Sequence, residues 1–342
     1  MSKYFGKSKL RSEDARFLKG LGRYSDDFSM KNMGYMYVIR SPHPSALIRN
    51  IDFCEALKIK GVLGIYSYLD IKDHLGTLPC FANYTKSNNQ PMYIPNRYIL
   101  AKNKLVYVGQ PIICVVAESL NIAMDAADYV KLDFDILDSV TDIKKAVSSS
   151  SHVVWEDCND NIAFEYSEGN KKKVESLFKR AKHTITIDHS ISRVYAAPME
   201  SRSALGFYDK SDEKFTLYTG TQGPHNLKKI LANNILKICN NKIRVISPDM
   251  GGAFGMRSSV YPEMPLVLWF SKLLGRPIKW TASRSEGFLC DDQGRENWSS
   301  ITLALDKEFN FLALRVKTLA SLGAFISSSG ASPPTANLGG LA

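Results

Sequence analysis

A glycine-rich loop between a predicted strand and a predicted helix constrains this 342-residue chain more than any other feature. Lys242–Ser247 (KIRVIS) alternates apolar and polar side chains, which predicts a strand. Glu263–Leu274 is apolar on most sides and is followed by Gly275, which predicts a buried helix with a glycine cap. Between them lies Pro248–Arg257 (PDMGGAFGMR), whose glycines let the backbone approach another group closely.

This glycine loop permits two interpretations. A loop between a strand and a helix commonly binds phosphate through free backbone N–H groups and the positive end of the helix dipole. The spacing matches neither G-x-G-x-x-G nor G-x-x-x-x-G-K-[ST], so a nucleotide-dependent oxidoreductase is poorly supported. The alternative is a tight turn packed against its neighbours. The bulky Phe254 among the glycines favours a loop with one fixed wall.

The chain is long enough for two domains of roughly 150 residues each. Its hydrophobic content of 44% and charged content of 23% are typical of a soluble globular protein. No apolar run approaches the ~20 residues of a transmembrane helix, and the N-terminus lacks the apolar core of a secretory signal. We therefore expect a cytoplasmic protein without a membrane span.

The net charge of +10 raises the question of a nucleic-acid partner. The basic residues are scattered, with one tight run at Lys171–Lys173, and acidic residues lie between them. We therefore expect a solvated basic surface and no nucleic acid, with an acidic partner subunit or an anionic cofactor as the alternative. The six cysteines are far apart, with no C-x-x-C pair, which argues against an iron–sulfur cluster or a zinc ribbon on this chain.

Residues 1–140 predict a mixed α/β region in which strands outnumber helices. Ser119 can cap a helix at Asn121–Val130, and residues 75–97 predict an irregular surface segment. The serine-rich stretch 138–152 is the natural linker. The predicted strands are Gly34–Arg40, Ile48–Phe53, Val62–Tyr68, Lys131–Leu137 and a long strand at Leu105–Ala117 that is kinked at Gly109–Pro111.

The second part of the chain predicts strands that lead through loops into helices. Thr221–His225 (TQGPH) opens a helix at Pro224–Cys239, in which proline suits the first helical position. Both this loop and the glycine loop stand where a strand passes to a helix, which is where open α/β sheets bind ligands. The predicted strands are Lys182–Val194, Ala204–Asp209, Lys214–Gly220, Pro277–Thr281, Ile301–Leu305 and Phe311–Ser321.

Six stretches together resemble a known family. They read RSEDARFLKGLGRYSDD, YVGQPIICVVAES, APMESRSALGFYD, TGTQGPH, VISPDMGGAFGMR and VYPEMPLVLWFSKLLGRPIKWTASRSE, in this order along the chain. They closely resemble the molybdopterin-binding large subunit of the molybdenum hydroxylases, the family of xanthine dehydrogenase, aldehyde oxidase and aerobic carbon monoxide dehydrogenase. The resemblance covers essentially the whole chain and is nearest the carbon-monoxide-dehydrogenase-like branch.

The resemblance implies an α+β (mixed α/β) fold with two domains. Residues 18–137 would form an a/b hammerhead domain, 138–152 a linker, and 153–342 an incomplete first molybdopterin-binding domain. The implied cofactor is molybdenum–molybdopterin in its cytosine dinucleotide form. The implied activity is water-dependent oxidation or hydroxylation of an aldehyde, an N-heterocycle or carbon monoxide. Electrons would pass to a 2Fe–2S small subunit and an FAD-binding medium subunit.

The same resemblance implies a set of site residues. Gln222 corresponds to the family glutamine that contacts the oxygen ligands of molybdenum, where a carboxamide can donate a hydrogen bond without adding charge; its alternative role is to cap the following helix. Phe254 would lie against the metal site, and Glu200 and Glu263 would be structural carboxylates. The residues implied to border the cofactor are Gln222, Gly223, Gly252, Ala253, Phe254 and Gly255.

The chain also departs from the family pattern. Ser258 stands where xanthine-type members carry a purine-binding glutamate, which disfavours a purine substrate. Family subunits are roughly twice as long, so the glutamate that acts as general base would lie in a C-terminal half, and no residue of this chain matches it. The alternative function is a truncated, non-catalytic family remnant that acts as a binding or assembly module. The substrate is not identified.

Overall fold

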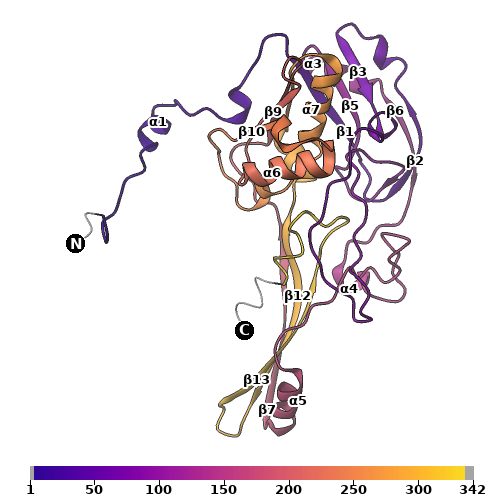
Figure 1. The fold of residues 1–342 in the computed structure, drawn as a ribbon. Helices are drawn as coiled ribbons and strands as arrows, with labels where there is room; N and C mark the ends of the chain where they lie inside the picture. Colours follow the sequence, from indigo (N-terminus) through magenta and orange to yellow (C-terminus); the bar gives the residue numbers. More distant parts are fainter. Residues whose placement is uncertain (1–3, 336–342) are drawn as a thin grey trace.

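The computed structural model describes residues 4–335 and shows an α+β fold (Figure 1). The expected second domain ends at residue 342, and its last seven positions, 336–342, lie outside the described residues. Among the described residues, no helix has the length and apolar character needed to cross a membrane.

The largest sheet has seven strands in the order β10-β9-β8-β11-β1-β5-β3. β1 and β11 pair in parallel, with Gly34 opposite Ile278, and β9 and β10 also pair in parallel. The other neighbours are antiparallel. One sheet therefore contains strands from both sides of the predicted linker. Its strands are β1 (Gly34–Arg40), β3 (Val62–Tyr66), β5 (Pro111–Ala117), β8 (Ser203–Asp209), β9 (Lys214–Thr219), β10 (Ile243–Ile246) and β11 (Ile278–Thr281).

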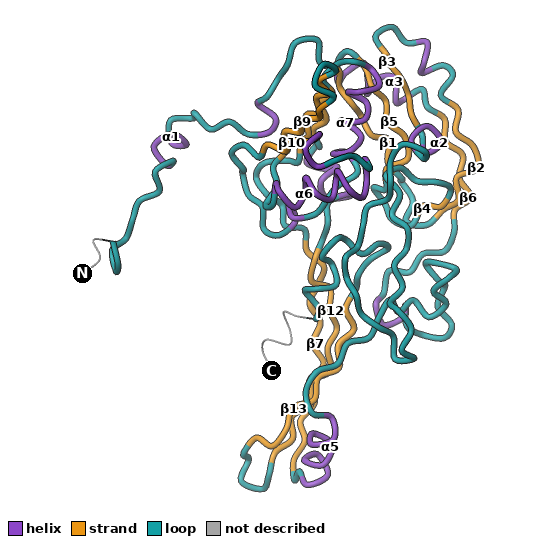
Figure 2. Tube along the Cα trace, viewed as in Figure 1, coloured by secondary structure: helices purple, strands orange, loops and turns teal. Residues whose placement is uncertain are grey.

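Two smaller sheets complete the β structure. β2 (Ala46–Asp52) lies between β4 (Lys104–Leu105) and β6 (Lys131–Ile136). The other sheet has the order β13-β12-β7 and extends away from the main body like a stalk (Figures 1 and 2). Its strands are β7 (His183–Val194), β12 (Gly294–Leu305) and β13 (Phe311–Ala320).

The stalk sheet has one covered and one uncovered face near its far end. Helix α5 (Lys171–Arg180) packs on one face, where the guanidinium carbon of Arg315 lies 4.1 Å from the centre of the Phe178 ring. Cross-strand partners share a face, so the strand register places a set of aliphatic side chains on the opposite one. We call this set the aliphatic face; it consists of Ile185, Ile187, Ile301, Leu303, Leu314 and Val316.

Helices α7 and α3 pack on the main sheet. α7 (Glu263–Leu274) is buried against β8 and ends at Gly275, whose φ of +63° is the left-handed cap that the sequence predicts. α3 (Leu120–Asp128) is capped by Ser119, whose Oγ accepts a hydrogen bond from the N–H of Ile122 at 3.2 Å. The remaining α-helices are α1 (Asp14–Leu18), α2 (Tyr68–Ile71), α4 (Ile143–Ala146), α6 (Pro224–Ile230) and α8 (Arg284–Cys290).

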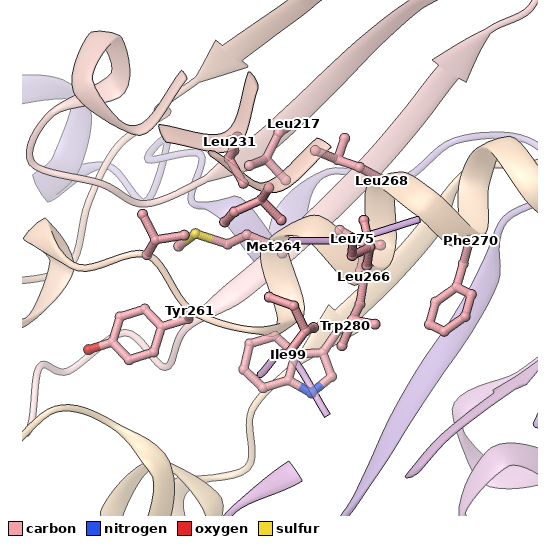
Figure 3. Close-up of a cluster of buried hydrophobic side chains, with 14 of the residues drawn as sticks. Leu75, Ile99, Leu217, Leu231, Tyr261, Met264, Leu266, Leu268, Phe270 and Trp280 are labelled. Carbon is pink, nitrogen blue, oxygen red and sulfur yellow. The ribbon is translucent and has the colours of Figure 1, made fainter. Parts of the chain in front are cut away.

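One hydrophobic core connects the two parts of the chain. Leu75 and Ile99, which precede the predicted linker, belong to the same buried cluster as Leu217, Leu266 and Trp280, which follow it (Figure 3). Burial of such large side chains is the main favourable contribution to folding. The core therefore stabilises both parts together.

Two expected elements differ in the structure. The expected strand Leu105–Ala117 is divided: β4 ends at Leu105 and β5 begins at Pro111. At this break Gly109 has φ +96°, and a Cβ atom there would lie 2.6 Å from the carbonyl oxygen of Leu289, so the chain turns to let α8 approach. The expected helix Pro224–Cys239 becomes a π-helical turn at Leu231–Leu236 and stops there.

Candidate functional site

The loop after β9 and the glycine loop after β10 meet at one edge of the main sheet. β9 and β10 are adjacent and parallel, so both strands deliver their following loops to the same edge. The carbonyl oxygen of Arg257 accepts hydrogen bonds from the N–H of Gln222 at 3.1 Å and from Oγ1 of Thr221 at 3.2 Å. The two predicted loops therefore form one continuous surface.

Gln222 links the two loops through its side chain. Its Oε1 accepts hydrogen bonds from the N–H of Gly255 at 3.0 Å and from Oγ of Ser258 at 3.2 Å. Its Nε2 donates no hydrogen bond to any other described residue, and the residue is exposed. Gly223 is the N-cap of α6, and no side chain caps that helix, so Gln222 does not have the alternative capping role. The carboxamide is thus held by its oxygen, with its nitrogen donors free among the described residues.

The glycine loop presents backbone donors. Gly252, Phe254 and Gly255 have φ values of +109°, +52° and +87°, so left-handed residues recur along the loop. Within residues 4–335, the N–H groups of Gly252, Ala253 and Phe254 make no hydrogen bond. Consecutive N–H groups in such a loop suit an anionic or strongly polar ligand. This donor set fits the polar periphery of a pterin cofactor.

Phe254 lies over the loop with its outer side open. The residue is 73% exposed, and a Cβ atom added at Gly252 would lie 2.8 Å from one of its ring carbons. The described chain therefore surrounds Phe254 on only one side. In the part of the chain that the structure describes, no three His, Cys, Asp or Glu side chains gather as a metal-binding group.

A buried ion pair lies beneath the glycine loop. Oε2 of Glu200 accepts a hydrogen bond from the N–H of Gly251 at 2.9 Å and lies 2.8 Å from Nη1 of Arg257. Nη2 of Arg257 donates to the carbonyl oxygen of Glu200 at 2.6 Å. Burial lowers the pKa of Arg257 below its ordinary value, although Glu200 opposes that shift. Glu200 thus makes the hydrogen bond and ion pair that a structural carboxylate would make, and its non-catalytic role stays a prediction.

The N-terminal segment forms hydrogen bonds with the start of the glycine loop. The sequence analysis did not predict this contact. Nη2 of Arg16, in α1, donates to Oδ1 of Asp249 at 2.7 Å, and the N–H of Arg23 donates to Oδ2 at 2.8 Å. These bonds, that from Arg16 first, lower the pKa of Asp249 to about 2. The N–H and Oγ of Ser25 donate to Oε1 of Glu200 at 3.2 and 3.1 Å. The motif near residue 16 was visible in the sequence, but its partner more than 200 residues later was not.

Glu263 supports the site from further away. Its carboxylate lies 2.5 Å from Nη2 of Arg40, in β1, and 2.9 Å from Nη1 of Arg202, which precedes β8. Its side chain is 1% exposed. Although burial raises the pKa of this carboxyl, the two arginines outweigh it and lower the pKa to about 2. Glu263 thus makes the buried ion pairs that a structural carboxylate would make, and its non-catalytic role stays a prediction.

Two family models match the chain. Residues 154–340 match the molybdopterin cofactor-binding domain, and residues 19–138 match the aldehyde oxidase and xanthine dehydrogenase a/b hammerhead domain. Both candidate loops lie within the first of these matches.

Curated relatives are similar along nearly the whole chain. The nicotine 6-hydroxylase large subunit of Paenarthrobacter nicotinovorans is 33% identical over 320 residues, which cover 94% of this chain and 38% of the relative. The carbon monoxide dehydrogenase large chain of Hydrogenophaga pseudoflava is 29% identical over 326 residues, which cover 92% of this chain and 39% of the relative. The chain thus spans about two fifths of the length of these relatives.

Solved structures show the same fold. Quinoline 2-oxidoreductase from Pseudomonas putida 86 superposes with a TM-score of 0.79 at 30% identity, covering 92% of this chain and 39% of that protein. Carbon monoxide dehydrogenase from Oligotropha carboxidovorans superposes with a TM-score of 0.82 at 26% identity, with the same coverage of 92% and 39%. These matches confirm the resemblance and the fold class. The chain belongs to the family of molybdopterin-binding large subunits that includes xanthine dehydrogenase, aldehyde oxidase and carbon monoxide dehydrogenase.

Proposed function

We propose that the two loops bind the molybdenum–molybdopterin cofactor of an oxidoreductase. One observation carries the proposal: Gln222 is held by Gly255 and Ser258 with its amide donor free, beside the unpaired N–H groups of Gly252–Phe254. When bound, the cofactor supplies the redox chemistry of water-dependent oxidation or hydroxylation. Gln222 and Phe254 would lie nearest the metal, and the backbones of Gly223, Gly252, Ala253 and Gly255 would border the pterin.

The substrate would be a small aldehyde, an N-heterocycle or carbon monoxide. The names of two relatives, a nicotine hydroxylase and a quinoline oxidoreductase, favour an N-heterocycle. At the site itself, the hydroxyl of Ser258 donates a hydrogen bond to Oε1 of Gln222 and carries no charge. This supports a substrate other than a purine. Among the residues of this chain we assign no catalytic base.

The partners would be the remainder of a large subunit, a 2Fe–2S small subunit and an FAD-binding medium subunit. The relatives are named as large subunits or chains, and this chain spans about two fifths of them. We propose that the remainder supplies the general-base glutamate and covers the aliphatic face of the stalk sheet. The cytosine dinucleotide form of the cofactor and a cytoplasmic location stay predictions from the sequence.

Metal analysis tests the proposed function. The chain would be prepared from its native host with and without the remainder of the large subunit, and its molybdenum and pterin would be measured. We expect both in the co-purified complex. Gln222→Leu should reduce them, whereas Gln90→Leu, which replaces another exposed glutamine outside both loops, should not. Absence of molybdenum from both preparations would support the alternative, a binding or assembly module without catalysis.

A further inference from the structure

The ion pair between Glu200 and Arg257 lies below the surface that the proposed cofactor would contact. The side chains of Glu200 and Arg257 are 10% and 1% exposed. The attraction within a buried ion pair often fails to offset the cost of removing both charges from water, so a pair at this position needs a reason beyond stability. Its contacts suggest one.

The two carboxylate oxygens of Glu200 hold different segments. Oε1 accepts from the N–H and Oγ of Ser25, at 3.2 and 3.1 Å, and so holds the N-terminal segment. Oε2 accepts from the N–H of Gly251 at 2.9 Å and faces Arg257 at 2.8 Å, and so holds the glycine loop. Charge-assisted hydrogen bonds of this kind are stronger than neutral ones and fix the geometry more closely.

Arg257 connects the same pair to the other loop. Its guanidinium Nη2 donates to the carbonyl oxygens of Glu200 at 2.6 Å and of Ser201 at 3.3 Å. Its own carbonyl oxygen accepts from the N–H of Gln222 at 3.1 Å. A shift of Arg257 would therefore move the backbone that carries the proposed metal-facing amide.

The neighbouring sequence leaves room for this guanidinium. A Cβ atom at Gly220 would lie 2.1 Å from Nη1 of Arg257, far inside van der Waals contact. Gly220 follows β9 and precedes Thr221 and Gln222. The space for the guanidinium of Arg257 is therefore provided by the same loop that carries Gln222.

We propose that Glu200 and Arg257 are positioning residues that set the spacing between Gln222 and the glycine loop. This inference rests on the proposed function, because the spacing matters only if both loops contact one ligand. Neither side chain touches the ligand. They act through the N–H of Gly251 and the backbone of Gln222.

Amide hydrogen exchange of the full chain tests the positioning role without cofactor. In Glu200→Gln and Arg257→Met, we expect the amides of Gly251 and Gln222 to exchange about 10- to 100-fold faster, as the loss of a charged hydrogen bond implies. Arg257→Lys restores the charge and should recover part of the protection. Gly220→Ala leaves both charges in place but displaces the guanidinium, and should accelerate the same two amides.

Glu286→Gln is the matched control. Glu286 is a 15% exposed carboxylate that lies 2.6 Å from Nε of Arg40, and it touches neither loop. We expect it to leave the two loop amides unchanged. Equal acceleration in Glu286→Gln, or no acceleration in the Glu200 and Gly220 variants, would overturn the proposal, because the pair would then act only on overall stability.

A second measurement separates this inference from the proposed function. Molybdenum and pterin content would be compared between wild type and Glu200→Gln in the complex isolated from the host. We expect a severalfold lower content in the variant. Loosened loops with unchanged content would overturn the positioning role. If the wild-type complex itself lacks molybdenum, the proposed function fails and the positioning role fails with it, while the exchange data still show whether the pair fixes the loops.

Discussion

Glu263 lies at the centre of one buried network of charges. It faces Arg40 and Arg202, and Arg202 also lies 2.5 Å from Oδ1 of Asp291. Arg40 comes from β1 and Glu263 from α7, so this network joins segments from both sides of the predicted linker. The side chains of Arg40 and Arg202 are 8% and 4% exposed. Water therefore cannot take the place of a carboxylate that either arginine loses.

Glu263→Gln should therefore destabilise the chain strongly. We expect the free energy of unfolding to fall by about 3–5 kcal/mol, as when one partner of a buried pair is removed. Glu213→Gln is the control, because Glu213 forms an exposed pair with Lys242 and should cost less than about 1 kcal/mol. Urea denaturation of both variants gives the comparison. Equal effects would mean that the buried network contributes no more than a surface pair.

The same carboxylate predicts a pH dependence. Burial raises the pKa of Glu263, but Arg202 and Arg40 lower it from an ordinary 4.5 to about 2 in the folded chain. A depressed pKa contributes stability that is present above 4.5 and is lost as the pH falls toward about 2. The free energy of unfolding should thus decline between pH 5 and pH 3, and Glu263→Gln should flatten that decline. A variant that declines as steeply as wild type would exclude this source.

At the scale of elements, α7 packs closely on β8. A Cβ atom at Gly206, in β8, would lie 2.5 Å from the carbonyl carbon and oxygen of Val267, in α7. The backbone of α7 cannot move aside for the added Cβ atom as the end of a flexible side chain could. Gly206→Ala should lower the free energy of unfolding by at least ~1–3 kcal/mol, the usual cost of overpacking. Gly294→Ala, at the start of β12 with no atom within 4 Å of the added Cβ, should change it little. Thermal unfolding of both variants tests this difference, and equal effects would contradict the prediction.

Elements with strong local signals could be predicted from the sequence. β1 and α7 have the predicted bounds, Gly34–Arg40 and Glu263–Leu274, because one is apolar and bracketed by breaks and the other is apolar and ends at a glycine. α5 and α8 were missed. α5 is polar on most sides and packs through a few residues such as Phe178. α8 begins with a capping box between Ser283 and Glu286, and this S-x-x-E signal was present in the sequence but was not used.

The site was predictable only in part. The sequence predicts two loops at strand-to-helix junctions, and the parallel pairing of β9 and β10 brings them together. The support beneath them could not be predicted, because Arg16–Asp249 and Ser25–Glu200 join residues with no periodic or spacing relationship. The exposure of Phe254 and its backbone φ of +52° also could not be predicted, because no local sequence pattern indicates either.

At the scale of the whole molecule, the aliphatic face governs how the isolated chain behaves. Ile185, Ile187, Leu314 and Val316 are 52–61% exposed, and they lie on both sides of Ile301 and Leu303 of the central strand β12. A contiguous exposed apolar surface favours association. We therefore expect the chain expressed alone to self-associate.

Ile187→Lys should weaken that association without unfolding the chain, because the side chain is 61% exposed. Ser190→Lys, on the other face of the same strand β7, adds the same charge and is the control. Sedimentation velocity over a range of concentrations should show a smaller mean mass for Ile187→Lys alone. A sharp monomer for wild type, or equal effects of the two lysines, would contradict the prediction.

The parallel pairing of β1 with β11 also bears on how this protein can be recombined with its relatives. A crossover in 138–152, between the two matched stretches, would take β1, β3 and β5 from one parent and β8–β11 from the other. The two parents would then have to fit at one seam, where Gly34 lies opposite Ile278 and a Cβ atom at Gly34 would lie 2.9 Å from its Cδ1. A chimera that folds therefore needs all the strands of this sheet to fit one another. A hammerhead segment can be exchanged only together with the strand that it pairs with.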